Sequence, residues 1–353
     1  MGQILDSQMQ APAPLKPWRQ APSAFIPDLL IFVAALAAAE ATISLTGFKG
    51  KLAVVFLFAF YSTIGSMVLA FRRRGAKAMS NAMSTSFVYL SIALVALPLF
   101  SVVFTVISRG RHALRLNTFT QDMASTQPDG PFNQGGAIHA IVGTVILIIL
   151  ATVISVPIGV LTGLYLTEVK GRADGLIRFL VQAMSGVPSI VAGLFIYAVW
   201  IVGGHGGFSG FSGAVALSIL MLPTVARTAE EVLKLIPNDL REAGVALGGT
   251  QWRTVVMVVL PAARSGLITA TVLGIARIAG ETAPLLLTIF GTTAKHFNPF
   301  VGPISALPLY IFQLMATGLD MAMARAWTGA LVLLALVSIL FTFARVIGGR
   351  IKS

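Results

Sequence analysis

Cysteine is absent from this chain of 353 residues, so disulfide bonds and thiolate chemistry are excluded. Charged residues are scarce, at 11% of the chain, whereas an average soluble domain has about 25%. The sequence lacks the G-x-x-x-x-G-K-[ST] order of a phosphate-binding loop, so we expect no ATP binding or hydrolysis by this chain itself. We expect no covalent chemistry and no catalytic residue in this chain. We also expect no metal site, because the histidines stand apart, with no second ligand at metal spacing: His112, His139, His205 and His296.

Apolar residues dominate instead. They make up 56% of the sequence, and the mean hydropathy is +0.87. A helix needs about 20 apolar residues to cross a bilayer. The candidate spans are Phe25–Leu45, Leu52–Phe71, Met83–Ile107, Ala137–Leu166, Leu176–Val202, Phe211–Val225, Gly266–Phe290 and Trp327–Ile347. We therefore predict an all-α, polytopic transmembrane helix bundle of about eight spans.

Two segments depart from this simple pattern. Residues 1–23 are rich in proline and alanine and lack the regions of a signal peptide, so we expect a disordered start. Val301–Met315 is short and holds two prolines, which predicts a loop or a re-entrant segment. We divide the chain into an N-terminal extension with a transmembrane hairpin, residues 1–80, and a membrane domain of six core helices, residues 81–350.

The net charge of +12 is compatible with nucleic-acid binding. However, no stripe of Lys and Arg interleaves with aromatic residues, so we expect no nucleic-acid partner. With the N-terminus inside, most Lys and Arg residues fall on cytoplasmic segments, which predicts that both termini are cytoplasmic. The outer segments are Ser108–Gly136, Gly203–Gly210 and Gly291–Ala324, and together they offer a surface for a protein partner.

Between two apolar runs lies a polar segment with the pattern of consecutive short helices. In order, it predicts a helix over 227–236 ended by Pro237, a helix over Leu240–Leu247 capped by Asn238 or Asp239 and ended by Gly248-Gly249, and a helix over Gln251–Val259 capped by Thr250 and limited by Pro261. A passive connection is usually short and needs no capped helices. We therefore predict a docking element for a cytoplasmic partner.

This segment resembles the EAA loop of the membrane subunits of bacterial ABC importers. That loop reads Glu-Ala-Ala, three residues, Gly, nine residues, then Ile-x-Leu-Pro. The matching residues are Glu242, Ala243, Gly244, Gly248, Val258, Leu260 and Pro261. Gly replaces the second Ala and Val replaces Ile, both conservative in size. The resemblance implies a type I permease fold and a loop that sits in a groove of an ATPase subunit.

Further segments resemble the phosphate permeases of this class, the PstA type. They are Thr162–Glu168, Ser185–Phe195, Leu222–Glu231, Ala276–Leu286 and Asn298–Phe300. The resemblance runs from about Met83 to Gly349, so it leaves the first 80 residues unexplained. It implies inorganic phosphate as the transported substrate.

Two charged residues stand inside the run Gly266–Phe290. If its helix begins near Gly266, Arg277 lies about 16 Å along it, near the middle of the membrane, with Glu281 on the same face. A charge at that depth costs on the order of 3 kcal/mol, so the pair must face the bundle interior or water. An intrahelical salt bridge that fixes packing is one interpretation. We favour a pathway site, in which Arg277 donates to a passing phosphate and Glu281 holds the arginine.

Arg227 stands at the cytoplasmic end of its span, with Glu230 and Glu231 three and four residues on. The chemistry alone leaves two alternatives open, an ordinary helix-surface ion pair and a second anion contact at the exit of the pathway. The family resemblance favours the second.

Small residues also recur at helical spacing within the spans. They are Gly159, Gly163, Gly266, Ala270 and Gly274. Such faces let membrane helices approach closely, and we predict that they pack within the subunit.

The resemblance implies a membrane permease subunit of an ATP-driven phosphate importer in the bacterial plasma (inner) membrane. The implied partners are membrane lipid, a homologous permease of the PstC type, two ATPase subunits of the PstB type that bind ATP and Mg²⁺, and an extracytoplasmic phosphate-binding protein of the PstS type. Three alternatives stay open: an importer for another oxyanion such as sulfate or molybdate, an ion-coupled secondary transporter or channel, and a regulatory membrane scaffold.

Overall fold

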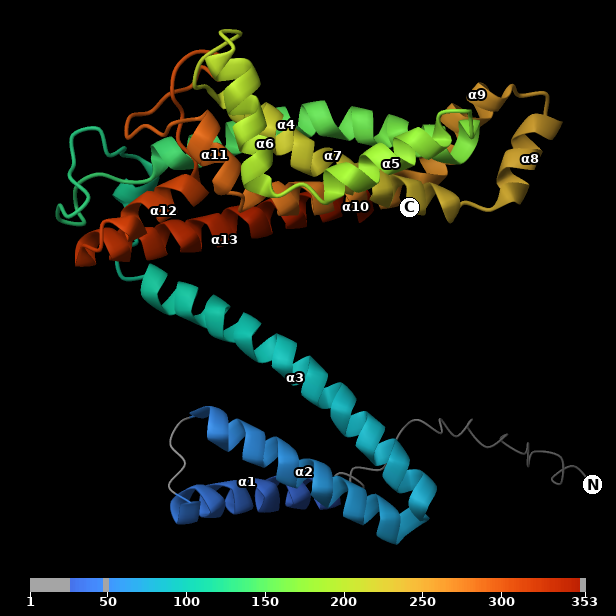
Figure 1. Ribbon diagram of the computed structural model, residues 1–353, viewed down its shortest axis with the longest axis vertical. Coiled ribbons are helices and arrows are strands. Elements are labelled where there is room, and N and C mark those ends of the chain that lie inside the picture. The colour runs from blue at the N-terminus through green and yellow to red at the C-terminus, as the bar shows by residue number, and fades with distance from the viewer. Residues whose placement is uncertain (1–25, 47–50, 350–353) are drawn as a thin grey trace, which may run out of the picture. The chain divides into compact units, whose positions relative to one another are not determined.

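The computed structural model describes residues 26–46 and 51–349 (Figure 1). The predicted disordered start, residues 1–23, lies outside the described residues. Regular structure in the described part is helical, apart from one isolated bridge between Phe290 and Ile304. Seven of the described helices are long and apolar enough to span a membrane, or eight if a bent pair counts as one span. The predicted all-α transmembrane bundle is confirmed.

The described residues form two compact units that divide between Val102 and Val103. The first unit holds α1 (Ile26–Thr46), α2 (Lys51–Arg74) and most of α3 (Ala76–Gly110). Both predicted spans of the hairpin are therefore helices of sufficient length. The functional boundary at residue 80 stays a prediction.

The second unit holds all remaining elements. In order they are η2 (Leu116–Phe119), α4 (Ile138–Leu164), η3 (Tyr165–Val169), α5 (Asp174–Ser185), α6 (Ser189–Ile196), η4 (Tyr197–Val202), α7 (Gly210–Lys234), α8 (Asn238–Ala246), α9 (Gln251–Thr254), η5 (Val255–Val259), α10 (Leu260–Ala279), α11 (Ala283–Thr288), α12 (Leu307–Ala316) and α13 (Asp320–Gly349). The segments η3, η4 and η5 are π-helical. Figure 1 shows α8 and α9 at one end of this unit and its long loops at the other.

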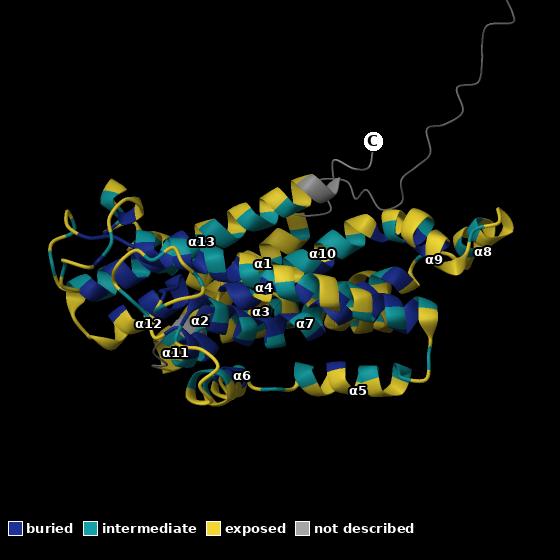
Figure 2. Cartoon of the chain, turned by 90° about the horizontal axis from the view of Figure 1, so that it is seen from above, coloured by how far each residue is buried: buried dark blue, intermediate teal, exposed yellow. Residues whose placement is uncertain are grey.

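The core of the second unit lies between α4 and α7, which hold more buried residues than any other two helices (Figure 2). Glycines allow the close contact. A methyl group on Gly159 of α4 would come within 2.8 Å of the Cγ1 atom of Val225, and one on Gly274 of α10 within 2.8 Å of the Cγ2 atom of the same valine. These contacts confirm that the small-residue faces pack within the subunit.

Gly143 of α4 approaches its neighbour more closely than Gly159 and Gly274 do. A methyl group there would lie 1.9 Å from the carbonyl oxygen of Ser305. Overpacking a core costs about 1–3 kcal/mol, so we expect Gly143→Ala to lower the unfolding temperature in detergent by several degrees. Gly175→Ala is the matched control, because no atom lies within 4 Å of the added methyl group in α5. Equal melting of the two variants would contradict this packing.

The predicted span Leu176–Val202 is wrong as a single helix. Its two helical parts, Asp174–Ser185 and Ser189–Val202, meet at an angle of 103°. Pro188 explains the break, because proline lacks an N–H donor and disfavours the helical conformation of the residue before it.

The predicted span Gly266–Phe290 is wrong at both ends. One continuous helical run extends from Gln251 to Ala279, and α11 follows after a break at residues 280–282. Gly280 has a low helix propensity, and Pro284 lies in the first turn of α11, where a missing N–H costs little.

The predicted loop or re-entrant segment Val301–Met315 is partly helical. Its second half lies in α12, whose 10 residues are too few to cross a bilayer. Leu307 and Leu309 of this helix are buried.

Candidate functional site

The polar segment forms a helix–turn–helix at one end of the second unit, with two differences from its predicted limits. The predicted helix over 227–236 is the end of α7, which runs unbroken for 25 residues to Lys234. The predicted cap by Asn238 or Asp239 is wrong, because both residues lie inside α8 and Pro237 holds the N-cap position. Proline is tolerated at the start of a helix, because the N–H that it lacks would have no acceptor within the helix there.

The turn after α8 agrees with its prediction. Gly248 has a φ of +84°, a conformation that favours glycine. Thr250 caps α9, since its Oγ1 atom accepts from the backbone N–H of Arg253 at 3.3 Å. Pro261 does not end this helix, because the π-helical turn η5 precedes it and shifts the hydrogen-bond register where the proline N–H is missing.

The surface of this element suits a docking role. No residue of α8 is buried, including Glu242, Ala243 and Gly244. Leu247 at the turn is 90% exposed, and Trp252 of α9 is 66% exposed. Large exposed apolar side chains that cluster on a polar element mark interaction sites.

Gly244 has a packing role at the contact between α8 and α9. A methyl group on it would come within 2.5 Å of the Cγ2 atom of Thr254. The glycine therefore lets α8 approach α9.

Arg277 and Glu281 do not form an intrahelical salt bridge. Arg277 lies in the last turn of α10, and Glu281 lies beyond the helix end at Gly280. Among the described residues no ion pair joins them, and the Arg277 side chain is exposed while Glu281 is half-buried. The helix dipole favours a cation in a last turn.

Arg277 lies farther along its helix than the sequence indicates. Because the helical run begins at Gln251, Arg277 is about 39 Å from that start at 1.5 Å per residue. Its place is beside the break at residues 280–282, not in the middle of an unbroken span.

Two broken helices meet where α6 contacts α11, the helix that follows the break after Arg277. Gly193 of α6 packs against α11, where a methyl group on the glycine would come within 2.6 Å of the Cα atom of Pro284. Non-helical backbone at membrane depth is tolerated where it is buried in protein or lines a water-filled cavity, and discontinuous helices of this kind form the substrate sites of many transporters. The fold thus brings together Ser185–Phe195 and Ala276–Leu286, two of the segments with family resemblance.

Arg227 is not part of a helix-surface ion pair with Glu230 in the described structure. Glu230 is buried and pairs with Arg178 of α5 and with Lys234, whose Nζ atom is 2.6 Å from Oε1. Arg227 itself is exposed. An exposed arginine beside an apolar span requires water or a partner, so the second alternative, an anion contact, stays a prediction.

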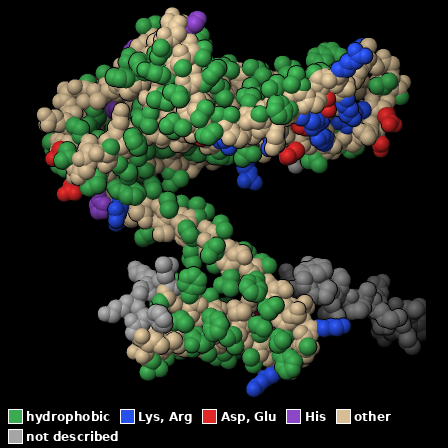
Figure 3. Space-filling model, viewed as in Figure 1, with side chains coloured by type: hydrophobic (Ala, Val, Ile, Leu, Met, Phe, Trp, Pro, Cys, Tyr) green, Lys and Arg blue, Asp and Glu red, His purple; other side chains and the backbone are tan. Residues whose placement is uncertain are grey.

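A polar network that the sequence did not predict lies at the end of the unit that carries α8 and α9. Arg178 also pairs with Asp174, at 3.2 Å. Arg241 of α8 pairs with Glu168 of η3, at 2.9 Å between Nη2 and Oε1. Figure 3 shows acidic and basic side chains gathered at this end.

A second charged group organises the opposite end, where the long loops lie. Asp122 accepts hydrogen bonds from the backbone N–H groups of Lys295 and Ala124. Burial opposes the charged form of Asp122, but these hydrogen bonds outweigh it and hold the pKa of the carboxyl below its ordinary value. The outer segments Ser108–Gly136 and Gly291–Ala324 are therefore joined by these contacts.

Arg325 of α13 holds the segment 130–134, a role that the sequence did not predict. It is 5% exposed, and its Nη2 atom donates to three carbonyl oxygens at 2.8–2.9 Å. The acceptors are Gly130, Pro131 and Gln134.

We expect Arg325→Ala to expose residues 127–136 to proteinase K and to cost at least about 2 kcal/mol of stability, since hydrogen bonds to charged groups contribute about 1.5–3 kcal/mol each. Arg111→Ala is the control, because Arg111 is exposed and has no side-chain hydrogen bond within the described residues. Identical digestion of both variants would contradict the role of Arg325 in holding residues 127–136.

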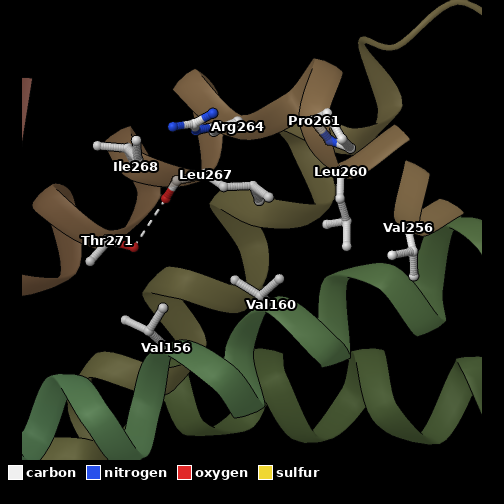
Figure 4. Close-up of a pocket in the computed structure, with 9 residues that line it drawn as sticks. All are labelled: Val156, Val160, Val256, Leu260, Pro261, Arg264, Leu267, Ile268 and Thr271. Atoms are coloured by element: carbon white, nitrogen blue, oxygen red, sulfur yellow. Dashed lines mark hydrogen bonds between the residues drawn. The ribbon is translucent and has the colours of Figure 1, made fainter. Parts of the chain in front are cut away.

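An apolar groove between α4 and α10 offers no anion site. It has a volume of about 380 Å³, and Figure 4 shows the side chains that line it. Arg264 is the one charged side chain among its lining residues, and Thr271 donates to the carbonyl oxygen of Leu267 at 3.0 Å. Its lining suits acyl chains or apolar side chains better than an oxyanion.

Comparisons with known proteins agree with this architecture. The family of binding-protein-dependent transport system inner membrane components matches residues 155–353. The phosphate transport system permease protein PstA of Pasteurella multocida (strain Pm70) is 41% identical over 248 residues, which cover 69% of this chain and 86% of the relative. PstA 1 of Mycobacterium tuberculosis (strain ATCC 25618 / H37Rv) is 37% identical over 272 residues, which cover 76% of this chain and 86% of the relative.

A solved inward-facing structure of the MetNI methionine ABC transporter is 23% identical and covers 62% of this chain and 95% of that chain, with a TM-score of 0.47. The family match extends over more than half of this chain, and the chain covers most of each PstA relative. The chain therefore belongs to the binding-protein-dependent transport system inner membrane components, in the group of PstA permeases.

Proposed function

We propose that this chain is the membrane permease subunit of an ATP-driven importer for inorganic phosphate. Identity of 37–41% to relatives named as phosphate transport permeases is the observation that carries the proposal. The relatives argue for phosphate over sulfate or molybdate. The exposed helix–turn–helix argues for an importer with a cytoplasmic engine over a self-sufficient secondary transporter.

In this proposal the chain forms half of the pathway, and a homologous permease forms the rest. Arg277 lies beside the break between α10 and α11 and is exposed. A guanidinium presents a planar fork of donors that matches a phosphate oxyanion. Glu281 limits how tightly the anion binds, and Arg227 offers a later contact toward the cytoplasm.

The ATPase subunits bind ATP and Mg²⁺, and they bind α8 and the turn at Gly248. Both termini are cytoplasmic. The joined outer segments at the other end bind a soluble phosphate-binding protein. ATP-driven closure of the ATPase pair then shifts a two-state gate, because the partner binds one state of the permease more tightly than the other. This chain performs no covalent step.

Copurification from native membranes tests the assembly. A tagged chain, extracted in mild detergent, should bring with it a second permease and an ATPase, both identified by mass spectrometry. A chain that is purified alone from membranes where it is functional would contradict the proposal and favour the secondary transporter.

A further inference from the structure

The docking helix α8 has little apolar attachment to the rest of the subunit. None of its residues is buried, and it joins the fold through residues 235–237 on one side and 247–250 on the other. Packing of a buried face usually stabilises a helix, so a helix without such a face depends more on specific polar contacts for its orientation. The polar contacts of α8 are therefore the candidates for passing a movement of this helix to the membrane helices.

Arg241 supplies that contact. Within the described residues it is the one side chain of α8 that hydrogen-bonds to another element. Its Nε and Nη2 atoms donate to the carboxylate of Glu168 at 2.9–3.1 Å. It also donates to the carbonyl oxygens of Leu233 and Ile236, at 2.9 and 2.6 Å, which closes the end of α7. A bidentate arginine–carboxylate pair fixes direction as well as distance.

Glu168 also holds the helix on the other side of the turn. Its backbone carbonyl oxygen accepts from the Nε2 atom of Gln251, the first residue of α9, at 2.6 Å. Both limbs around Gly248 are thus fastened to one residue, α8 through the side chain and α9 through the main chain.

The residue that receives both limbs lies at the end of a core helix. Glu168 belongs to the π-helical turn η3, which continues α4. Its side chain is 9% exposed. Separation of a mostly buried ion pair leaves a charge without its partner, which is strongly unfavourable. The pair therefore resists partial opening when α8 is pushed.

The same π-helical turn also receives α5. Arg178 donates to the carbonyl oxygen of Leu166 in η3, at 3.4 Å, and pairs with Glu230 of α7. A cavity of about 630 Å³ is lined by Glu168, Arg178 and Arg241, so these charged groups face a common space.

We propose that Glu168 and Arg241 are positioning residues that transmit movement of the docking helix to α4 and so couple ATP hydrolysis to transport. This rests on the proposed function. The pair acts through the elements that it joins and touches no substrate.

The test measures phosphate transported per ATP hydrolysed by the complete importer in proteoliposomes. In Glu168→Gln and Arg241→Gln we expect ATP hydrolysis within about 3-fold of wild type, while the transport ratio falls at least about 10-fold, because charge-assisted pairing is lost. Glu231→Gln is the matched control, since Glu231 is exposed and has no ion pair within the described residues. It should keep the wild-type ratio.

Replacement of the Glu168–Arg241 ion pair by a covalent bridge distinguishes a role in coupling from a role in folding. The chain has no cysteine, so Glu168→Cys combined with Arg241→Cys can be bridged by a short bifunctional methanethiosulfonate. We expect an uncoupled complex in the reduced form and recovery of most of the transport ratio after bridging, with the wild-type complex treated in the same way as control.

A wild-type transport ratio in Glu168→Gln, or no recovery of the ratio after complete bridging, would contradict a coupling role for the Glu168–Arg241 pair. Failure of every variant to assemble, bridged or not, would assign the pair to folding and also refute it. A wild-type complex without ATP-driven phosphate uptake would instead refute the proposed function, so the two failures are distinguishable.

Discussion

Replacement of Arg277 by Gln should reduce ATP-driven phosphate uptake by at least about 100-fold, because hydrogen bonds to a charged group contribute about 1.5–3 kcal/mol each and a fork supplies two. The complex with the ATPase should still assemble, since Arg277 lies far along the helical run from the docking end. Arg277→Lys keeps the charge but loses the planar fork, so we expect an intermediate loss of about 10-fold. Radiolabelled phosphate uptake in reconstituted vesicles measures both effects.

Arg264→Gln is the matched control for this prediction. Arg264 is an exposed arginine on the same helix and lines the apolar groove. Its replacement should leave uptake within about 2-fold of wild type, since we place it outside the anion pathway. Wild-type uptake in Arg277→Gln would remove Arg277 from the pathway and favour a regulatory scaffold.

The second large effect is expected at the docking turn. Leu247 is 90% exposed, and burial of a leucine in a partner's groove contributes about 1.5–3 kcal/mol. We expect Leu247→Asp to weaken copurification of the ATPase by at least about 100-fold, because it removes this contact and buries a charge. Gly248→Val should also loosen the ATPase, since a β-branched residue is strained at a φ of +84°.

Leu116→Asp supplies the comparison. Leu116 is 86% exposed and lies in the long loop at the opposite end of the unit. Its replacement should not change recovery of the ATPase. If Leu247→Asp and Gly248→Val both retain the ATPase and couple normally, the docking role of this element is wrong.

Local chemistry explains what the sequence could predict. Gly248 must adopt a conformation that other residues avoid, and Thr250 must satisfy free N–H groups at a helix start. Both requirements act within a few residues, so both appear in the sequence and recur in the structure. The cap expected from Asn238 failed because Pro237 took that position.

Tertiary packing decides the features that the sequence did not predict. The partners Glu168 and Arg241 are 73 residues apart in the chain, and no local pattern pairs them. Arg325 was counted only as an outer charge, since its three carbonyl acceptors come from a loop about 190 residues earlier.

Phosphate uptake by the reconstituted complex tests the central claim most directly. Vesicles would hold this chain, the second permease and the ATPase subunits, with ATP inside and phosphate-loaded binding protein outside. We expect accumulation that stops without ATP and persists in a large excess of sulfate or molybdate. Uptake by this chain alone under an ion gradient, or equal competition by sulfate, would contradict the account.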